Sequence, residues 1–173
     1  MVAYNRLLDI QFNEESTTEP VTLVEAKDFC RIDIGTDDSL ITALITTARL
    51  MCEAYTGVGF VEHQAVAVLL NENGGKYIPY GPTGTINSVT DSDGVTLVLD
   101  TDYELSGNQF KRIVTAFNEE ITIDYTTGYS MLPEVLKTAL LNQVYYLYDN
   151  RSQQMDSEMS PIAKIILNPF KRV

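Results

Sequence analysis

Apolar residues recur at steps of three and four in three stretches of the chain, the spacing that places them on one face of an α-helix. The first stretch begins with Thr22-Leu23-Val24-Glu25, a capping box in which the Thr hydroxyl and the Glu carboxylate each accept a first-turn amide. The second ends at Thr56-Gly57, where glycine supplies the left-handed residue that often terminates a helix. We therefore predict helices over residues 22–32, 37–56 and 134–149, the last opened by Pro133 at its first-turn position.

Between the second and third helices, from about residue 60 to residue 129, short apolar runs alternate with turn signals. Asp91-Ser92-Asp93-Gly94 separates Ile86–Thr90 from Val95–Leu99, as a hairpin turn would. Further strands are expected at 61–70, 77–80, 103–105, 110–113 and 120–125, and one short strand is expected before Pro20. The pattern predicts an antiparallel sheet of hairpins and disfavours a parallel, nucleotide-binding sheet.

The predicted fold class is α+β and mainly helical, a bundle of three to four helices with an inserted antiparallel β-hairpin sheet. We expect an N-terminal arm over residues 1–21 and a single domain over 22–151, with the β insertion at 60–129. Residues 152–173 are expected to form a flexible link and a C-terminal docking segment, because a polar, Gln- and Ser-rich stretch precedes the apolar Ile162–Phe170.

The third helix is apolar around more of its circumference than a one-sided surface helix. Such a helix is buried on two sides of its own fold or meets another chain, and tyrosine is enriched at interfaces. An apolar C-terminal segment likewise docks on a partner or folds back on its own domain. The sequence leaves both alternatives open. The candidate partner-binding residues are Tyr145, Tyr146, Tyr148, Ile165, Ile166, Leu167 and Phe170.

The charge balance excludes some classes of function. The chain has 173 residues with 12 Lys and Arg against 24 Asp and Glu, a formal net charge of -12. Affinity for a nucleic-acid backbone comes from basic residues that neutralise phosphates, so a sequence-specific DNA-binding protein is not expected. No apolar stretch approaches the ~20 residues of a membrane-spanning helix, and residues 1–11 lack the order of a secretory signal. We expect cytoplasmic synthesis and no membrane partner.

The sequence offers little evidence for a catalytic or metal-binding site. Cys30 and Cys52 fall inside helical patterns, which is typical of reduced core thiols. One histidine and no CxxC motif leave no ligand set for zinc. Asp33, Asp37 and Asp38 fit a polar loop and a helix cap better than a metal site. We therefore expect no metal, no cofactor and no enzyme activity.

Several short motifs nevertheless occur together. They are Glu19-Pro20-Val21-Thr22-Leu23-Val24-Glu25-Ala26-Lys27, Arg31-Ile32-Asp33, Asp37-Asp38-Ser39-Leu40-Ile41, Glu53-Ala54-Tyr55-Thr56-Gly57, Ile123-Asp124-Tyr125, Gly128-Tyr129, Leu132-Pro133 and Ile166-Leu167-Asn168-Pro169-Phe170-Lys171. In these motifs the sequence resembles the tailed-phage head–tail connector family, the adaptor or head-completion proteins. The arm before Glu19 and the β region follow no tight family motif.

The resemblance implies a structural virion protein at the head–tail junction. Its subunits would form a homo-oligomeric ring, dodecameric in the virion, below the portal protein and above a stopper or tail-completion protein, with DNA only passing through. The acidic charge suits such a channel, since sliding DNA must not be held by its phosphates, and acids of the capping loops or β hairpins are expected to face the lumen. Two alternatives remain: another neck or tail-completion subunit of the tail-terminator type, and a small enzyme.

Overall fold

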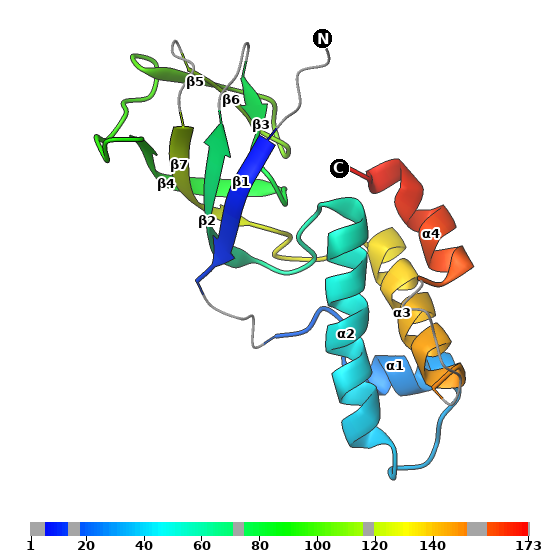
Figure 1. Cartoon of the computed structure of the whole chain (residues 1–173). Helices are drawn as coiled ribbons and strands as arrows, with labels where there is room; N and C mark the ends of the chain where they lie inside the picture. The colour runs from blue at the N-terminus through cyan, green and yellow to red at the C-terminus, as the bar shows by residue number, and fades with distance from the viewer. Residues whose placement is uncertain (1–5, 14–17, 71–74, 116–119, 152–158, 173) are drawn as a thin grey trace. The chain divides into compact units, whose positions relative to one another are not determined.

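The structure, a computed structural model, describes residues 6–13, 18–70, 75–115, 120–151 and 159–172 (Figure 1). The chain divides into two compact units. The β unit comprises Met1–Ser16 and Glu62–Tyr129, and the helical unit comprises Thr17–Val61 and Ser130–Val173. Residues of the expected N-terminal arm thus supply the first strand of the β unit.

The helical unit contains α1 (Leu23–Cys30), α2 (Asp38–Thr56), α3 (Glu134–Asp149) and α4 (Pro161–Leu167), followed by the 3₁₀ turn η1 (Asn168–Phe170). The three helices predicted from periodicity are confirmed, and so are the Thr22–Glu25 capping box and the left-handed Gly57. Two ends differ. Helix α1 stops at Cys30 because Arg31 adopts the left-handed conformation, and Pro133 is the N-cap of α3 rather than its first helical residue.

The β unit contains β1 (Arg6–Phe12), β2 (His63–Leu70), β3 (Lys76–Tyr77), β4 (Thr83–Asp91), β5 (Tyr103–Ser106), β6 (Arg112–Thr115) and β7 (Glu120–Thr127). They form two antiparallel sheets, ordered β1-β2-β7-β4 and β3-β6-β5. The α+β class is therefore confirmed, but the description of a helical bundle with a small insertion does not fit, because strands occupy a share of the chain comparable with the helices.

The strands also do not follow the predicted succession of hairpins. Among the described strands, β5 and β6 alone form a hairpin; β1 and β2 pair although α1 and α2 intervene in the sequence, and β7 lies between β2 and β4. Residues 95–99, expected as a strand, contribute two isolated bridges, Thr96 to Thr90 and Leu99 to Tyr103, and no continuous strand. Turn residues are local signals, while partner choice is decided by which apolar faces are buried together, so pairing at long range escaped the prediction.

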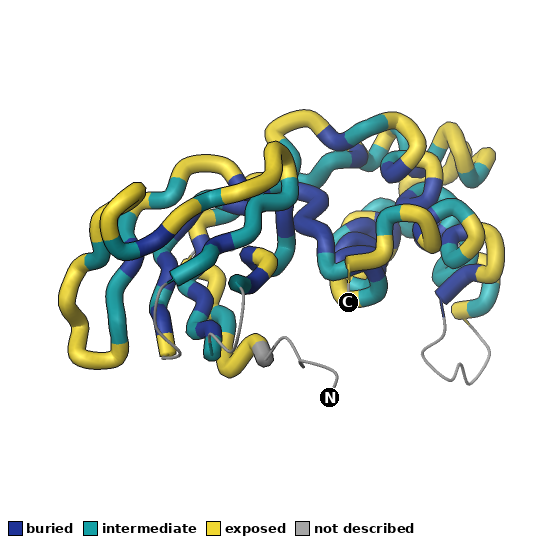
Figure 2. The backbone as a smooth tube through the Cα atoms, turned by 90° about the horizontal axis from the view of Figure 1, so that it is seen from above, coloured by how far each residue is buried: buried dark blue, intermediate teal, exposed yellow. Residues whose placement is uncertain are grey.

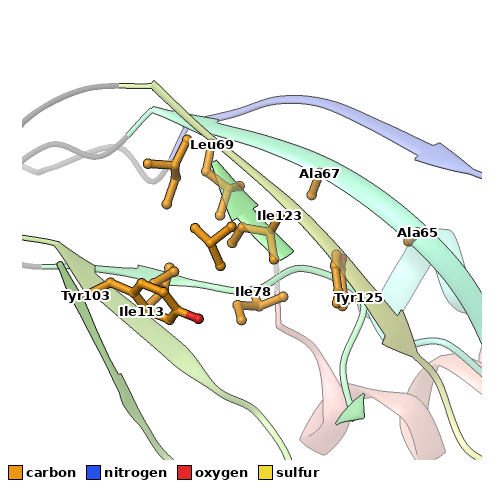
Figure 3. Packing of buried hydrophobic residues seen from close by; sticks show 10 residues of the cluster. Ala65, Ala67, Leu69, Ile78, Tyr103, Ile113, Ile123 and Tyr125 are labelled. Atoms are coloured by element: carbon orange, nitrogen blue, oxygen red, sulfur yellow. The ribbon is translucent and has the colours of Figure 1, made fainter. Parts of the chain in front are cut away.

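The core of the β unit lies between the two sheets (Figure 3). Ala65, Ala67 and Leu69 of β2 stand opposite Tyr125, Ile123 and Ile121 of β7, and all six are buried. Ile113 of β6 and Tyr103 of β5 close the core from the other sheet. A slip of one residue would turn the apolar set outward, so this alternation fixes the register of β2 against β7.

Helix α3 is the centre of the helical unit, since it contacts α1, α2 and α4. Its buried residues are Leu136, Ala139, Leu140, Gln143 and Val144. The wide apolar circumference is thus largely covered within the subunit itself. Figure 2 shows such buried positions recurring along the helices.

A buried ion network organises one end of this unit. Arg49 of α2 is only 5% exposed; its Nε donates to Glu19 Oε2 at 2.8 Å and its Nη1 to Glu53 Oε2 at 2.9 Å. The other Glu53 oxygen accepts the Phe60 amide at 2.7 Å. One guanidinium therefore joins the segment before α1, helix α2 and the chain that follows α2.

Two ion pairs fix α1, although the three- and four-residue spacing of its apolar residues predicts that Glu25, Lys27 and Asp28 face solvent. Lys27 Nζ pairs with Asp38 Oδ1 of α2 at 2.6 Å, and Lys137 of α3 donates to the Glu25 carboxylate. The hydrogen bond from Lys137, with those from the Thr22 amide and hydroxyl, lowers the pKa of Glu25 to about 2. The same spacing places Phe29 on the apolar face with Leu23, Ala26 and Cys30, yet Phe29 is exposed.

We predict that Arg49→Met destabilises the protein by about 3–5 kcal/mol, because it leaves Glu53 buried without its cation. Lys27→Met is the matched control and should cost about 0–1 kcal/mol, since that pair is partly solvated. Urea unfolding measures both free energies. Replacing the whole network (Glu19→Gln, Arg49→Met, Glu53→Gln) should recover much of the loss, whereas an Arg49→Met protein as stable as the wild type would contradict the role of the network.

The lowered pKa of Glu25 predicts a pH dependence. A carboxylate whose pKa falls on folding contributes stability above its unfolded pKa of 4.5, and this contribution is lost as pH falls toward about 2. Because the Glu25 side chain is 40% exposed, we expect at most about 1 kcal/mol. Unfolding free energies at pH 6 and in steps down to about 2 should therefore fall less steeply for Glu25→Gln than for the wild type. Parallel curves would contradict the prediction.

Candidate assembly surfaces

The three candidate tyrosines of α3 have different surroundings. Tyr148 donates its hydroxyl to Asp37 Oδ2 at 2.6 Å, which raises the pKa of Tyr148, and the Arg151 guanidinium lies 4.3 Å from the ring centre. Asp37 is the N-cap residue of α2, yet its carboxylate makes no cap hydrogen bond and instead accepts from Tyr148. Tyr146 is half-buried, and only Tyr145 is exposed. Tyr148 is thus a contact between α3 and α2.

The C-terminal segment (residues 159–172) is attached to its own helical unit at both ends. At its start, the Ser160 amide donates to Gln143 Oε1 of α3, fully buried, at 2.8 Å. At its end, the Tyr55 hydroxyl of α2 donates to Asn168 Oδ1 at 2.6 Å, and the Arg172 amide donates to the Thr56 carbonyl at 2.7 Å. Of the two alternatives that the sequence left open, this structure shows the segment folded back.

The four candidate residues of this segment, in α4 and η1, differ in how far they are buried. Leu167 is completely buried, with Ala163, and belongs to the core of the helical unit. Ile166 and Phe170 are half-buried. Ile165 is 72% exposed and its neighbour on the same face, Ile162, is 56% exposed. A partner therefore has access to the Ile162 and Ile165 face of α4, and Leu167 is unavailable while the unit is folded.

A second exposed apolar region lies in the β unit and was missed by the sequence reasoning. It belongs to the acidic loop (residues 91–104), which runs from the end of β4 into β5. Val95 and Val98 are 59% and 56% exposed, and Leu99 is exposed beside them. The signal in the sequence is a group of apolar residues in the same segment as Asp91, Asp93, Asp100, Asp102 and Glu104, but residues 95–99 were predicted only as a strand.

Two of these carboxylates hold the loop in shape. Asp91 Oδ1 accepts the amides of Asp93 and Val95 at 3.0 and 2.8 Å, and Asp102 Oδ2 accepts the Val98 amide at 2.8 Å. Such aspartate turns rigidify a loop without a regular ladder. The acidic loop therefore presents its valines in a defined conformation.

The described residues contain no group of three or more His, Cys, Asp or Glu side chains placed to hold a metal ion. Both cysteines are free thiols, and burial raises the pKa of Cys52 to about 12 and that of Cys30 above its usual value. Neither is the low-pKa thiolate of a nucleophilic cysteine. Within the same residues, no helix is long and apolar enough to cross a membrane. The candidate functional features are therefore two exposed surfaces, the Ile162 and Ile165 face of α4 and the acidic loop.

Comparison with protein-family models and with curated proteins gives no match. Solved structures do match. A chain from the neck of an empty gene transfer agent particle, computed with C6 symmetry, has a TM-score of 0.73 and 17% identity, covering 96% of both chains. A chain from the virion of a native gene transfer agent particle gives 0.73 and 16% over 95% of both chains.

A third match comes from the neck of the native particle computed with C12 symmetry, with a TM-score of 0.68 and 15% identity, covering 94% of this chain and 96% of that chain. The coverage includes both the β unit and the helical unit. The protein therefore shares its fold, along nearly its whole length, with these particle chains.

Proposed function

We propose that the protein is a structural subunit of the neck that joins head and tail in a tailed-phage-like virion. The observation that carries the proposal is the likeness, over 96% of both chains, to a chain of a gene transfer agent neck. Because one fold serves several functions, the proposal also needs support from the surfaces of this chain.

Ring assembly is supported by two exposed surfaces that differ from each other. Closed rings arise from heterologous contacts, in which one patch of a subunit meets a different patch of the next. Here the Ile162 and Ile165 face of α4 and the acidic loop are two such patches, on different units of the chain. Two of the related structures were computed with C6 and C12 symmetry, and we propose a twelve-fold ring.

Within the neck we assign the protein to the adaptor position, below the portal and above the stopper or tail-completion protein. The connector-like motifs support this assignment. The net charge of -12 supports a channel that DNA crosses without being held, because the affinity of proteins for DNA rests on released counterions and basic side chains. The role is mechanical, and the proposal assigns no reaction to the protein.

We predict that deleting the gene from the particle that encodes it yields DNA-filled heads and separate tails of normal length, with almost no joined particles. The reason is that the proposed position, between head and tail, makes the protein necessary for joining the two and for the assembly of neither. Electron microscopy and sedimentation of lysates measure the three species. Purified full-length protein added to the lysate should restore joining, which controls for effects on neighbouring genes.

Other outcomes identify other functions. Tails of irregular length would assign the protein to the tail end, as a terminator, and normally joined particles would overturn a neck role altogether.

A further inference from the structure

Charge is distributed unevenly along the chain, and the two exposed apolar surfaces lie in oppositely charged stretches. The acidic loop carries five carboxylates, and no Lys or Arg occurs between residues 77 and 110. The C-terminal segment carries Lys164, Lys171 and Arg172, and no Asp or Glu occurs between residues 159 and 173. In a chain of net charge -12, a basic stretch of this kind is conspicuous.

On the acidic side, the carboxylates that do not shape the loop remain accessible. Asp93 and Glu104 are exposed and flank the exposed Val95 and Val98. The acidic loop therefore combines exposed valines with exposed carboxylates, the composition of a protein-binding patch.

On the basic side, the contacts of the segment orient it. Burial of Ala163 and Leu167 fixes which face of α4 points inward, so Ile162 and Ile165 point away from the unit. Lys171 lies 4.8 Å from the ring centre of Tyr55, which places one positive charge at the end of η1, and Lys164 is half-buried beside the exposed isoleucines. This segment too combines exposed apolar side chains with charged ones, and its charges are positive.

We propose that, in the ring, the acidic loop of one subunit binds the Ile162 and Ile165 face and the basic end of the C-terminal segment of the next subunit. The inference rests on the proposed neck function, since it names the contact that closes the ring. The two surfaces match in both apolar character and charge, and opposite charges around an apolar contact set which surfaces meet.

A second copy is the occupant that the observations favour. Both halves of the complementary pair belong to the same chain, and a head-to-tail contact between them repeats around a ring. The sequence analysis expects acids of the β hairpins to face the lumen of a DNA channel. Three exposed apolar side chains beside those acids favour burial against protein over exposure to a water-filled channel.

Reciprocal charge reversal tests the contact. The loop variant is Asp93→Lys with Glu104→Lys, and the C-terminal variant is Lys164→Glu with Lys171→Glu. Asp91 and Asp102 are kept because they hold the loop, and Asp100 is kept because its φ of 63° suits aspartate better than lysine. Sedimentation of the full chain over a range of concentrations measures self-association.

Each variant alone should self-associate at least about tenfold more weakly than the wild type, because like charges then meet at every contact. An equimolar mixture of the two should recover the wild-type association, since alternating subunits meet opposite charges at every contact and a twelve-fold ring closes with alternating members. Failure of the mixture to recover association would overturn the proposal, since mixing does not rescue a contact made within one chain.

The matched control is Asp28→Lys with Glu62→Lys, which makes the same change in net charge at exposed positions outside both surfaces. It should associate like the wild type, and if it weakens association as much as the loop variant, net charge rather than this contact is responsible. Thermal melts of every variant verify folding, including Lys171→Glu, which loses its position over Tyr55.

Carbodiimide cross-linking provides a second measurement that detects brief contacts. Isotope-labelled and unlabelled full-length chains are mixed, cross-linked between carboxylates and lysines, and digested. Peptides joining the acidic loop to Lys164 or Lys171 should contain one labelled and one unlabelled partner in half of the cases. Only like-labelled pairs, or no such pairs, would overturn the proposal. The two proposals can fail separately. If gene deletion separates heads from tails but the cross-linked pairs are absent, the neck function stands and only this contact is rejected.

Discussion

The arrangement of the helical unit depends on the ion pairs that the buried Arg49 guanidinium makes with Glu19 and Glu53. A buried cation is tolerated only where carboxylates surround it, and Glu19 and Glu53 do so from two different parts of the chain. Glu53 in turn accepts the Phe60 amide. The approach to α1 and the departure from α2 are therefore both set by one side chain, and these are the places where the chain leads from and to the β unit.

Local signals predicted the helices well, for reasons that particular residues make clear. The capping box at Thr22 and Glu25 and the glycine at 57 specify ends regardless of what the helix packs against. The spacing of apolar residues misplaced Lys27, which its ion pair with Asp38 draws into a partly buried position, and Phe29, which is exposed. The order of strands could not be predicted, since β7 pairs with two strands far from it in sequence.

The candidate surfaces were also predicted only in part. Apolar composition indicated the segment around α4, but only the packing separates the buried Leu167 from the exposed Ile165. In the acidic loop, a run of valine and leucine has the composition of a strand, but local aspartate turns at Asp91 and Asp102 hold it outside a regular ladder. Tertiary packing thus decides which residues of the C-terminal segment are exposed, whereas local turns shape the acidic loop.

The β unit interrupts the helical unit in sequence, and this has a consequence for the order of events during synthesis. Strand β7, which joins β2 to β4, precedes α3 and α4 in the chain and therefore leaves the ribosome ahead of them. The sheet of the β unit is therefore able to close while α1 and α2 still lack the helix that covers them, and domains generally fold in the order in which they are made. Completion of the helical unit waits for its last two helices, so a nascent chain displays an assembled β unit and an open helical face at the same time.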